Sequence, residues 1–181
     1  MKSRARFGFL VLLLTGAVPC AMAHSAAEAS RDEAALEREK AAVLAVIEEQ
    51  AAAFWAKDFE RWAETWVHAP YVRRVGWSAA GGVSNVEGWE AIGAGMRKRM
   101  ADDPKPNLTP AKLVREHLSF RFYGDVAWVT FDQRGVATGE ARFDMPGLSH
   151  ETRIFERRDG KWKVAYLGYL LVGTPDDKPT R

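Results

Sequence analysis

The spacing of apolar residues changes partway along this chain of 181 residues, and that change limits its possible folds more than any other feature. Before Pro104, apolar residues recur at intervals of three, four and seven, as they do along one face of a helix. From Lys112 onward they alternate with polar residues, as they do in a strand with one buried face. Helices followed by strands predict an α+β fold, in which three helices pack on one face of a curved, mostly antiparallel sheet and leave a cone-shaped space.

The first two helices are predicted to form a hairpin. The first begins at Leu36, and the apolar residues that follow at helical spacing are Val43, Ile47 and Phe54. Asp58 fits the N-cap of the second helix, because its carboxylate can accept a hydrogen bond from a free backbone N–H at the helix start. Pro70 is expected to end that helix, and a short strand over residues 71–77 to follow it.

A third helix is predicted from a capping motif. Residues 84–87 read Ser-Asn-Val-Glu, the S-x-x-E form in which each polar side chain bonds to a free backbone donor. The helix is therefore expected to begin there and to end near Asp103, before Pro104. Its apolar face would carry Trp89, Ile92, Met96 and Met100.

Two glycine-containing turns divide the rest of the chain into hairpins. Gly124 with Asp125 and Asp159 with Gly160 are the predicted turns. The strands beside them are expected over residues 118–122, 127–131, 152–155 and 162–172. On the second of these strands Ala127, Val129 and Phe131 are expected to face the core. The same alternation directs Gln133 inward and Asp132 outward.

The first 23 residues have the pattern of a secretory signal peptide. Basic residues at positions 2, 4 and 6 precede an apolar run, and Ala21-Met22-Ala23 fits a small-x-small cleavage site. We therefore expect a secreted or periplasmic protein, without a membrane span once the signal is removed, because the apolar run is too short. The expected divisions are a signal peptide at 1–23, a flexible segment at 24–35, a folded domain at 36–173 and a flexible tail at 174–181.

Cleavage of this signal would leave a nearly neutral chain without cysteine. It would remove three of the 26 basic residues and none of the 24 acidic ones, so 158 residues with a formal charge of −1 would remain. This balance argues against a nucleic-acid partner. Cys20, the only cysteine, would leave with the signal, which excludes disulfides, thiolate catalysis and cysteine-bound zinc. The four histidines lack metal-ligand spacing, so neither a metal nor a cofactor is expected.

The last hairpin carries a family resemblance. The string E-T-R-I-F-E-R-R-D-G-K-W-K-V over residues 151–164, preceded by G-D-V-A at 124–127, resembles the nuclear transport factor 2-like superfamily. More narrowly, the chain is similar to SnoaL-like domains and to the association domain of calcium/calmodulin-dependent protein kinase. The resemblance implies the cone-shaped, cystatin-like fold. The string itself is specific for the fold and weak for chemistry, because Asp-Gly-Lys-Trp makes a hairpin whatever the pocket contains.

The association domains place arginines in a deep pocket that can receive carboxylate ligands. By position, one of these arginines matches Arg153, whereas the other two fall at Gln133 and Tyr169. The histidine expected early in the third helix falls at Ile92, and a His-x-His run in the last strand falls at residues 166–168, Tyr-Leu-Gly. The chain thus resembles the family's scaffold more closely than its ligand site.

Five residues are predicted to bind a ligand: Arg153, Gln133, Tyr169, Tyr166 and Trp77. A guanidinium in an apolar pocket can hold a carboxylate or polarise a carbonyl through paired hydrogen bonds. The alternative for Arg153 is a structural ion pair with Glu151, Glu140 or Asp132. The two tyrosines lie on opposite faces of the last strand, so at most one enters the pocket. Trp77 belongs to a set of tryptophans that either line the pocket or fill the core.

Three functions are compatible with these features. The first is an exported domain that binds a small, partly apolar molecule in its cone, as a homodimer formed through the sheet. The second is a cyclase, isomerase or dehydratase that transfers protons with a pocket tyrosine or aspartate, which requires an ionisable pair within hydrogen-bond reach inside the cone. The third is an assembly module without a ligand, which requires that no cavity exist. No catalytic residue is assigned.

Overall fold

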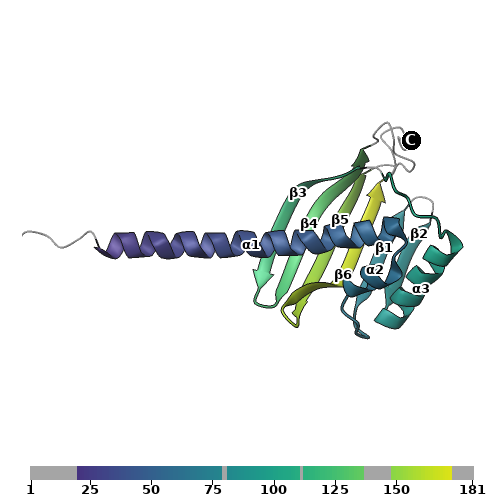
Figure 1. Ribbon diagram of the computed structural model, residues 1–181, viewed down its shortest axis with the longest axis horizontal. Coiled ribbons are helices and arrows are strands. Elements are labelled where there is room, and N and C mark those ends of the chain that lie inside the picture. Colours follow the sequence, from purple (N-terminus) through teal and green to yellow (C-terminus); the bar gives the residue numbers. More distant parts are fainter. Residues whose placement is uncertain (1–19, 79–80, 111, 137–147, 173–181) are drawn as a thin grey trace, which may run out of the picture. The chain divides into compact units, whose positions relative to one another are not determined.

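The computed structural model describes residues 20–78, 81–110, 112–136 and 148–172 (Figure 1). The chain divides into two compact units, residues 1–38 and residues 39–181. In the first unit the described residues belong to helix α1 (Cys20–Ala56). The predicted helix start at Leu36 was therefore wrong, because the Ala- and Glu-rich residues before it also favour a helix. Most of the predicted signal peptide and the predicted tail lie outside the described residues.

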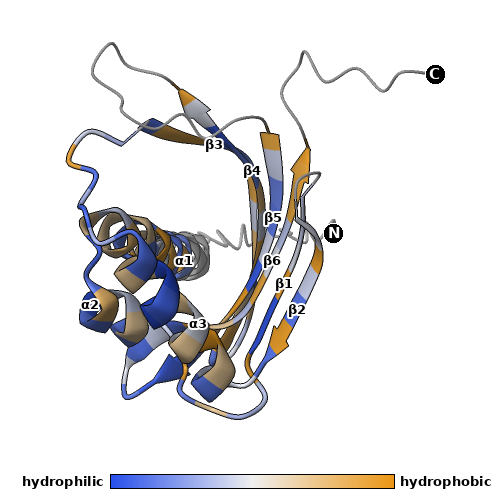
Figure 2. Cartoon of the chain, turned by 90° about the vertical axis from the view of Figure 1, so that its right-hand side faces the viewer, coloured by the Kyte–Doolittle hydropathy of each residue, from blue (hydrophilic) through white to orange (hydrophobic). Residues whose placement is uncertain are grey.

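The second unit has two layers, as predicted. Helices α2 (Phe59–Glu64) and α3 (Trp89–Asp102) lie with the second half of α1 on the concave face of a curved sheet (Figure 2). The sheet has six strands in the order β2-β1-β6-β5-β4-β3, and only the β1–β6 pair is parallel. The strands are β1 (Arg73–Ser78), β2 (Gly82–Glu87), β3 (Lys112–Tyr123), β4 (Val126–Val136), β5 (Leu148–Arg158) and β6 (Lys161–Val172). The α+β prediction is confirmed.

Both predicted hairpin turns are confirmed by their backbone angles. Asp159 and Gly160 have φ values of 51° and 75°, the pair of positive angles that a two-residue hairpin turn between twisted strands requires. Gly124, between β3 and β4, has a φ of 60°. The predicted N-cap is confirmed as well, since the Asp58 carboxylate accepts a hydrogen bond of 3.1 Å from the backbone N–H of Arg61.

Two predicted helix boundaries were wrong. Residues 84–87 form part of β2, paired antiparallel with β1, and the third helix begins only after Gly88. The N-cap residue of this helix is Gly88, which has a φ of 83° and forms no side-chain cap. The S-x-x-E motif therefore does not cap the helix, and its residues lie in a strand. The second helix ends at Glu64 rather than near Pro70, because the backbone around Trp66 turns to hydrogen-bond with Val164 of β6.

Two bulges change which residues face the helices. In β3 the register with β4 shifts between Glu116 and Ser119, where His117 has a φ of 54°. In β6 the register with β5 shifts at Ala165. Each bulge inserts an extra residue and so reverses the alternation of inward and outward side chains beyond it. The inward residues of β6 are therefore Trp162 and Val164 before the bulge, and Leu167, Tyr169 and Leu171 after it.

The core fills the space between the concave face and α1 and α2. Its largest fully buried side chains are Trp66, Phe155, Ile47, Val43, Val72, Val129 and Val164. Ala127, Val129, Phe131 and Gln133 are all buried, which confirms the predicted inward face of β4. Trp62, Trp66 and Trp162 are core residues too. Toward the start of β5 and the end of β6 the core gives way to a cavity.

Candidate functional site

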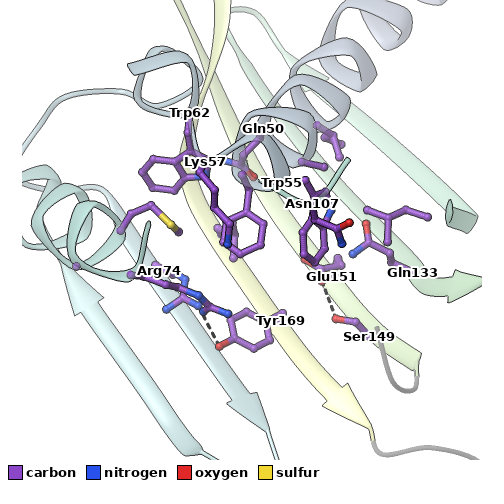
Figure 3. Close-up of a pocket in the computed structure, with 18 of the residues that line it drawn as sticks. Gln50, Trp55, Lys57, Trp62, Arg74, Asn107, Gln133, Ser149, Glu151 and Tyr169 are labelled. Atoms are coloured by element: carbon purple, nitrogen blue, oxygen red, sulfur yellow. Dashed lines mark hydrogen bonds between the residues drawn. The ribbon is translucent and has the colours of Figure 1, made fainter. Parts of the chain in front are cut away.

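A cavity of about 1010 Å³ opens between the concave face and the helices (Figure 3). Side chains from all three helices, from the segment after α3 and from five of the six strands line it. Its apolar lining is Ile47, Ala51, Phe54, Trp55, Trp62, Met96, Leu113, Leu167 and Leu171. Such a mixture of apolar walls and a few polar groups is typical of small-molecule sites.

Arg153 lines this cavity and belongs to a buried ion pair. Its side chain is 8% exposed, that of Glu151 is 6% exposed, and Nη2 of the arginine lies 3.1 Å from Oε2 of the glutamate. Nη1 donates to Oε1 of Gln50, and the Ser149 hydroxyl donates to Oε1 of Glu151 at 2.6 Å. Of the predicted partners for Arg153, Glu151 is thus the one present, Asp132 is bound elsewhere, and Glu140 lies outside the described residues.

Arg115 was not among the predicted site residues. Its side chain is only 5% exposed, its Nη1 pairs with the Glu48 carboxylate of α1, and its Nε donates to Oε1 of Gln133 at 3.0 Å. Burial lowers the pKa of Arg115, the charge of Glu48 opposes that shift, and the positive charge of Arg153 adds to it. Both guanidiniums lie about equally far from the Phe131 ring, at 5.9 Å and 5.8 Å from its centroid.

Arg74 of β1 is a second lining arginine that the sequence reasoning missed. It donates from Nη2 to the Tyr169 hydroxyl at 3.2 Å, and its guanidinium carbon lies 5.2 Å from the centre of that ring (Figure 3). Tyr169 can take this position because its neighbour across the strand pair is Gly76, where a Cβ atom would overlap the ring. Among the described residues Arg74 has no carboxylate within ion-pair distance.

Two positions that lack the family's arginine are thus each contacted by an arginine from a neighbouring strand. Arg115 lies directly opposite Gln133 in the β3–β4 pairing, and Arg74 contacts Tyr169 across the β1–β6 pairing. A position-by-position comparison with the family could not find these arginines, since they come from other strands. The sequence indicated the roles of Arg115 and Arg74 only weakly. Whether either side chain faces the cavity depends on how its strand pairs with its neighbours.

Tyr166 and Trp77 lie away from the cavity, which corrects their predicted placement. The two tyrosines lie on opposite faces of β6, and the bulge at Ala165 makes Tyr169 the inward one and Tyr166 the outward one. Trp77 is 41% exposed and pairs with Leu170, which is 55% exposed, so both lie on the outer face. Of the predicted ligand-binding residues, the structure brings Arg153, Gln133 and Tyr169 together in the lining.

The described lining carries more positive than negative charge. Its acidic residues are Asp102, Asp103 and Glu151, and its basic residues are Lys57, Arg74, Lys98, Arg99, Lys105, Arg115 and Arg153. A concave surface with low-dielectric walls concentrates the field of such an excess. The cavity therefore favours an anionic group over a cationic one.

The carboxylates that line the cavity are already engaged. No histidine belongs to the described lining, and Asp102 and Asp103 pair with Lys98 and Lys57, each at 2.7 Å. Asp132 points away from the cavity, as the alternation predicts, and accepts hydrogen bonds from His117 and His150 at 2.8 Å and 2.6 Å. These bonds lower the pKa of Asp132.

Two further searches of the described residues gave no site. They hold no group of three or more His, Cys, Asp or Glu side chains arranged for a metal ion. Within the same described part of the chain, no helix has the length and apolar character needed to cross a membrane.

The chain belongs to the SnoaL-like family. The model of the SnoaL-like domain matches residues 43–169, which cover the C-terminal part of α1 and every strand of the sheet except the last residues of β6. The resemblance of the last hairpin to SnoaL-like domains is thereby confirmed. A comparison with proteins of curated function gave no match.

Solved structures of the nuclear transport factor 2-like class share the fold. A protein of Streptomyces avermitilis, provisionally named a dehydratase of that family, has a TM-score of 0.58 against this chain, with 18% identity over 75% of this chain and 97% of its own. A provisional calcium/calmodulin-dependent protein kinase type II association domain of Thiobacillus denitrificans has a TM-score of 0.54, with 14% identity over 71% and 93%. A provisional ketosteroid isomerase of Parabacteroides distasonis has 0.52, with 17% identity over 75% and 88%. At these identities the likeness concerns the fold alone.

Proposed function

We propose that this SnoaL-like protein binds a small molecule with an apolar body and an acidic group in its cavity. The observation that carries the proposal is the excess of basic side chains in a large cavity whose walls are otherwise mainly apolar. A ligand of this kind would remove apolar surface from water while its acidic group met the positive field. The third hypothesis, an assembly module, required that no cavity exist, and this condition is not met.

An enzyme of the dehydratase or isomerase kind is the second candidate, and two of the similar structures carry such provisional names. That function needs a side chain free to accept or donate a proton beside the substrate. In the described lining, the carboxylates of Asp102, Asp103 and Glu151 each pair with a basic side chain. We therefore favour binding, and assign no reaction.

The proposal predicts a preference for anionic over neutral ligands of the same shape. Anilinonaphthalenesulfonate and N-phenylnaphthylamine are suitable fluorescent probes, because they differ only in the sulfonate. We expect the sulfonate to bind about tenfold more tightly or better, since a hydrogen bond to a charged group contributes about 1.5–3 kcal/mol. Fluorescence titration of the purified protein measures both affinities.

A variant that places a bulky side chain in the cavity is the control for binding elsewhere. Gly95 of α3 belongs to the lining, and a Cβ atom there would meet no atom within 4 Å. Gly95→Phe should therefore keep the fold, as circular dichroism would report, and should abolish binding of both probes. Equal affinities of the two probes for the wild-type protein, or probe binding that survives Gly95→Phe, would contradict the proposal.

We also propose that two copies pair through the outer face of the sheet after export of the protein. Trp128, Ile154 and Tyr166 are neighbours on β4, β5 and β6 of that face, which the helices of the second unit leave uncovered (Figure 2). Trp128 is 47% exposed, and an apolar patch of this kind is typical of an interface. Sedimentation equilibrium should give twice the mass of one chain for the wild type and the mass of one chain for Trp128→Glu. A wild-type protein with the mass of one chain at micromolar concentration would refute the pairing.

A further inference from the structure

We infer that Arg74 and Tyr169 form the subsite that binds the ligand's acidic group, and that this group is a carboxylate. The inference deepens the proposed function and rests on it. It moves the expected contact from Arg153, the candidate of the sequence, to an arginine on a different strand. The steps that lead to it concern charge pairing, position and the hydrogen-bond donors that remain.

Arg74 differs from the other buried or half-buried arginines of the cavity in having no acidic partner within the described part of the chain. Arg153 is paired with the buried carboxylate of Glu151, and Arg115 is paired with the exposed carboxylate of Glu48. A ligand carboxylate at either would have to displace an existing ion pair. At Arg74 it would displace none among the described residues.

Two other basic residues of the described lining also lack an ion pair. Arg99 and Lys105 are both exposed, whereas Arg74 is half-buried. An exposed cation is well solvated, so an ion pair with it contributes little. A half-buried guanidinium has lost part of its water and gains more from an anion that arrives. The burial of Arg74 therefore makes it the stronger site.

The position of Arg74 is set by the sheet. Arg74, Leu167 and Arg153 are opposite one another on β1, β6 and β5, so the two arginines are separated by two strand spacings, about 10 Å. Tyr169 lies one pleat further along β6, above Gly76, and its hydroxyl and ring both contact Arg74. This contact holds the guanidinium beside the Tyr169 side chain in the cavity (Figure 3).

The donors that remain suit a carboxylate. A single hydrogen bond of Arg74 is described, from Nη2 to the Tyr169 hydroxyl, so its other N–H groups are available. A guanidinium can offer two parallel N–H donors to the two oxygens of a planar carboxylate. The Tyr169 hydroxyl already accepts a hydrogen bond from Arg74. Its own hydrogen therefore remains available to donate to one of the carboxylate oxygens of the ligand. Leu167, Leu171 and Met96 provide the apolar wall for the rest of the molecule.

Arg74→Gln tests the inference with the two fluorescent probes. The variant should weaken anilinonaphthalenesulfonate binding about 10- to 100-fold, the worth of a charged hydrogen bond, and should leave the affinity for N-phenylnaphthylamine unchanged. Tyr169→Phe should produce a smaller loss for the sulfonate, because it removes one donor and the hydroxyl that orients Arg74. Competition by naphthoate, and none by naphthamide, is expected with the wild-type protein.

Two matched variants separate a local contact from a general effect of charge. Arg73→Gln changes the same charge on the same strand, on a residue whose partner is Glu87 at 2.5 Å outside the cavity. Arg99→Gln changes the same charge within the lining. Arg73→Gln should retain the preference for the sulfonate, and Arg99→Gln should reduce it much less than Arg74→Gln does.

The outcomes distinguish the two proposals. If the wild-type protein prefers the sulfonate and Arg74→Gln prefers it equally, the assignment to Arg74 is overturned while the proposed function stands. An equal loss in Arg74→Gln and Arg99→Gln also overturns it, in favour of a diffuse field. If naphthamide competes as well as naphthoate, the inference that the acidic group is a carboxylate is wrong. If the wild-type protein shows no preference between the two probes, the proposed function itself fails.

Discussion

Replacing Arg153 with alanine is expected to lower the free energy of unfolding by about 3–5 kcal/mol. The loss comes from Glu151, whose carboxylate is 6% exposed and would remain buried without its counter-charge. Gln50 would lose its contact with the same guanidinium. Urea denaturation of the wild type and the variant measures the difference.

A neutral replacement of the whole pair is the matched test. Arg153→Met combined with Glu151→Gln removes both charges of the buried pair. A glutamine at 151 can still accept the hydrogen bond from Ser149, so the double variant should regain most of the stability that Arg153→Ala loses. Arg61 pairs with Glu49 at 2.7 Å on the surface, where both side chains are nearly half exposed. Arg61→Ala should therefore cost far less stability than Arg153→Ala. A similarly small cost for Arg153→Ala would show that the buried pair does not have the structural role described.

Gly76→Ala is expected to destabilise the protein by about 1–3 kcal/mol, the usual effect of adding a methyl group to a filled space. The added Cβ would overlap the Tyr169 ring, which lies across Gly76 and supplies the three atoms nearest to that position. The ring must move, and its hydrogen bond with Arg74 should be lost with it. Denaturant unfolding measures the first effect, and titration with anilinonaphthalenesulfonate the second.

The double variant with Tyr169→Ala identifies the cause. Once the ring is absent, Gly76→Ala should have little effect on stability, so the two substitutions should be strongly non-additive. Gly95→Ala is a useful control, because a Cβ there meets nothing within 4 Å and alanine favours a helix. Equal destabilisation by Gly76→Ala in both backgrounds would mean that the cost arises from the backbone of β1 and not from the tyrosine.

The fold could be predicted because its strongest signals are local. The turn at residues 159 and 160 needs two positive φ angles, which Asp and Gly tolerate, and the alternation beside it places Trp162 in the core. The N-cap at Asp58 and the apolar face of α3 are local in the same sense. Each of these features depends on residues within a few positions of one another.

The site could be predicted only in part because its chemistry depends on long-range pairing. Gln133 was correctly directed inward, since no bulge interrupts β4. The choice between Tyr166 and Tyr169 depended on the bulge at Ala165, which no sequence pattern revealed. Arg74 and Arg115 reach the cavity from β1 and β3, at sequence distances of 95 and 18 residues from their partners Tyr169 and Gln133. Their roles follow from the sheet and not from their neighbours in the chain.

A wrong local signal also had a physical cause. Residues 84–87 satisfy the capping motif, but they can equally alternate as a strand, and pairing with β1 satisfies their backbone groups through a whole ladder. A capping box satisfies only a few donors at one helix end. The partner strand at residues 73–78 therefore decides the conformation, and this strand was only weakly indicated in the sequence.

Native mass spectrometry of the protein purified from its own host, beside Gly95→Phe prepared in the same way, tests ligand binding most directly. We predict that the wild-type protein carries one small molecule per chain, that the molecule released on denaturation is detected as an anion, and that the variant carries none. If the wild type and Gly95→Phe release the same molecules in the same amounts, or if the molecule bound to the wild type is a cation, the cavity is not the anion-binding site that its side chains indicate.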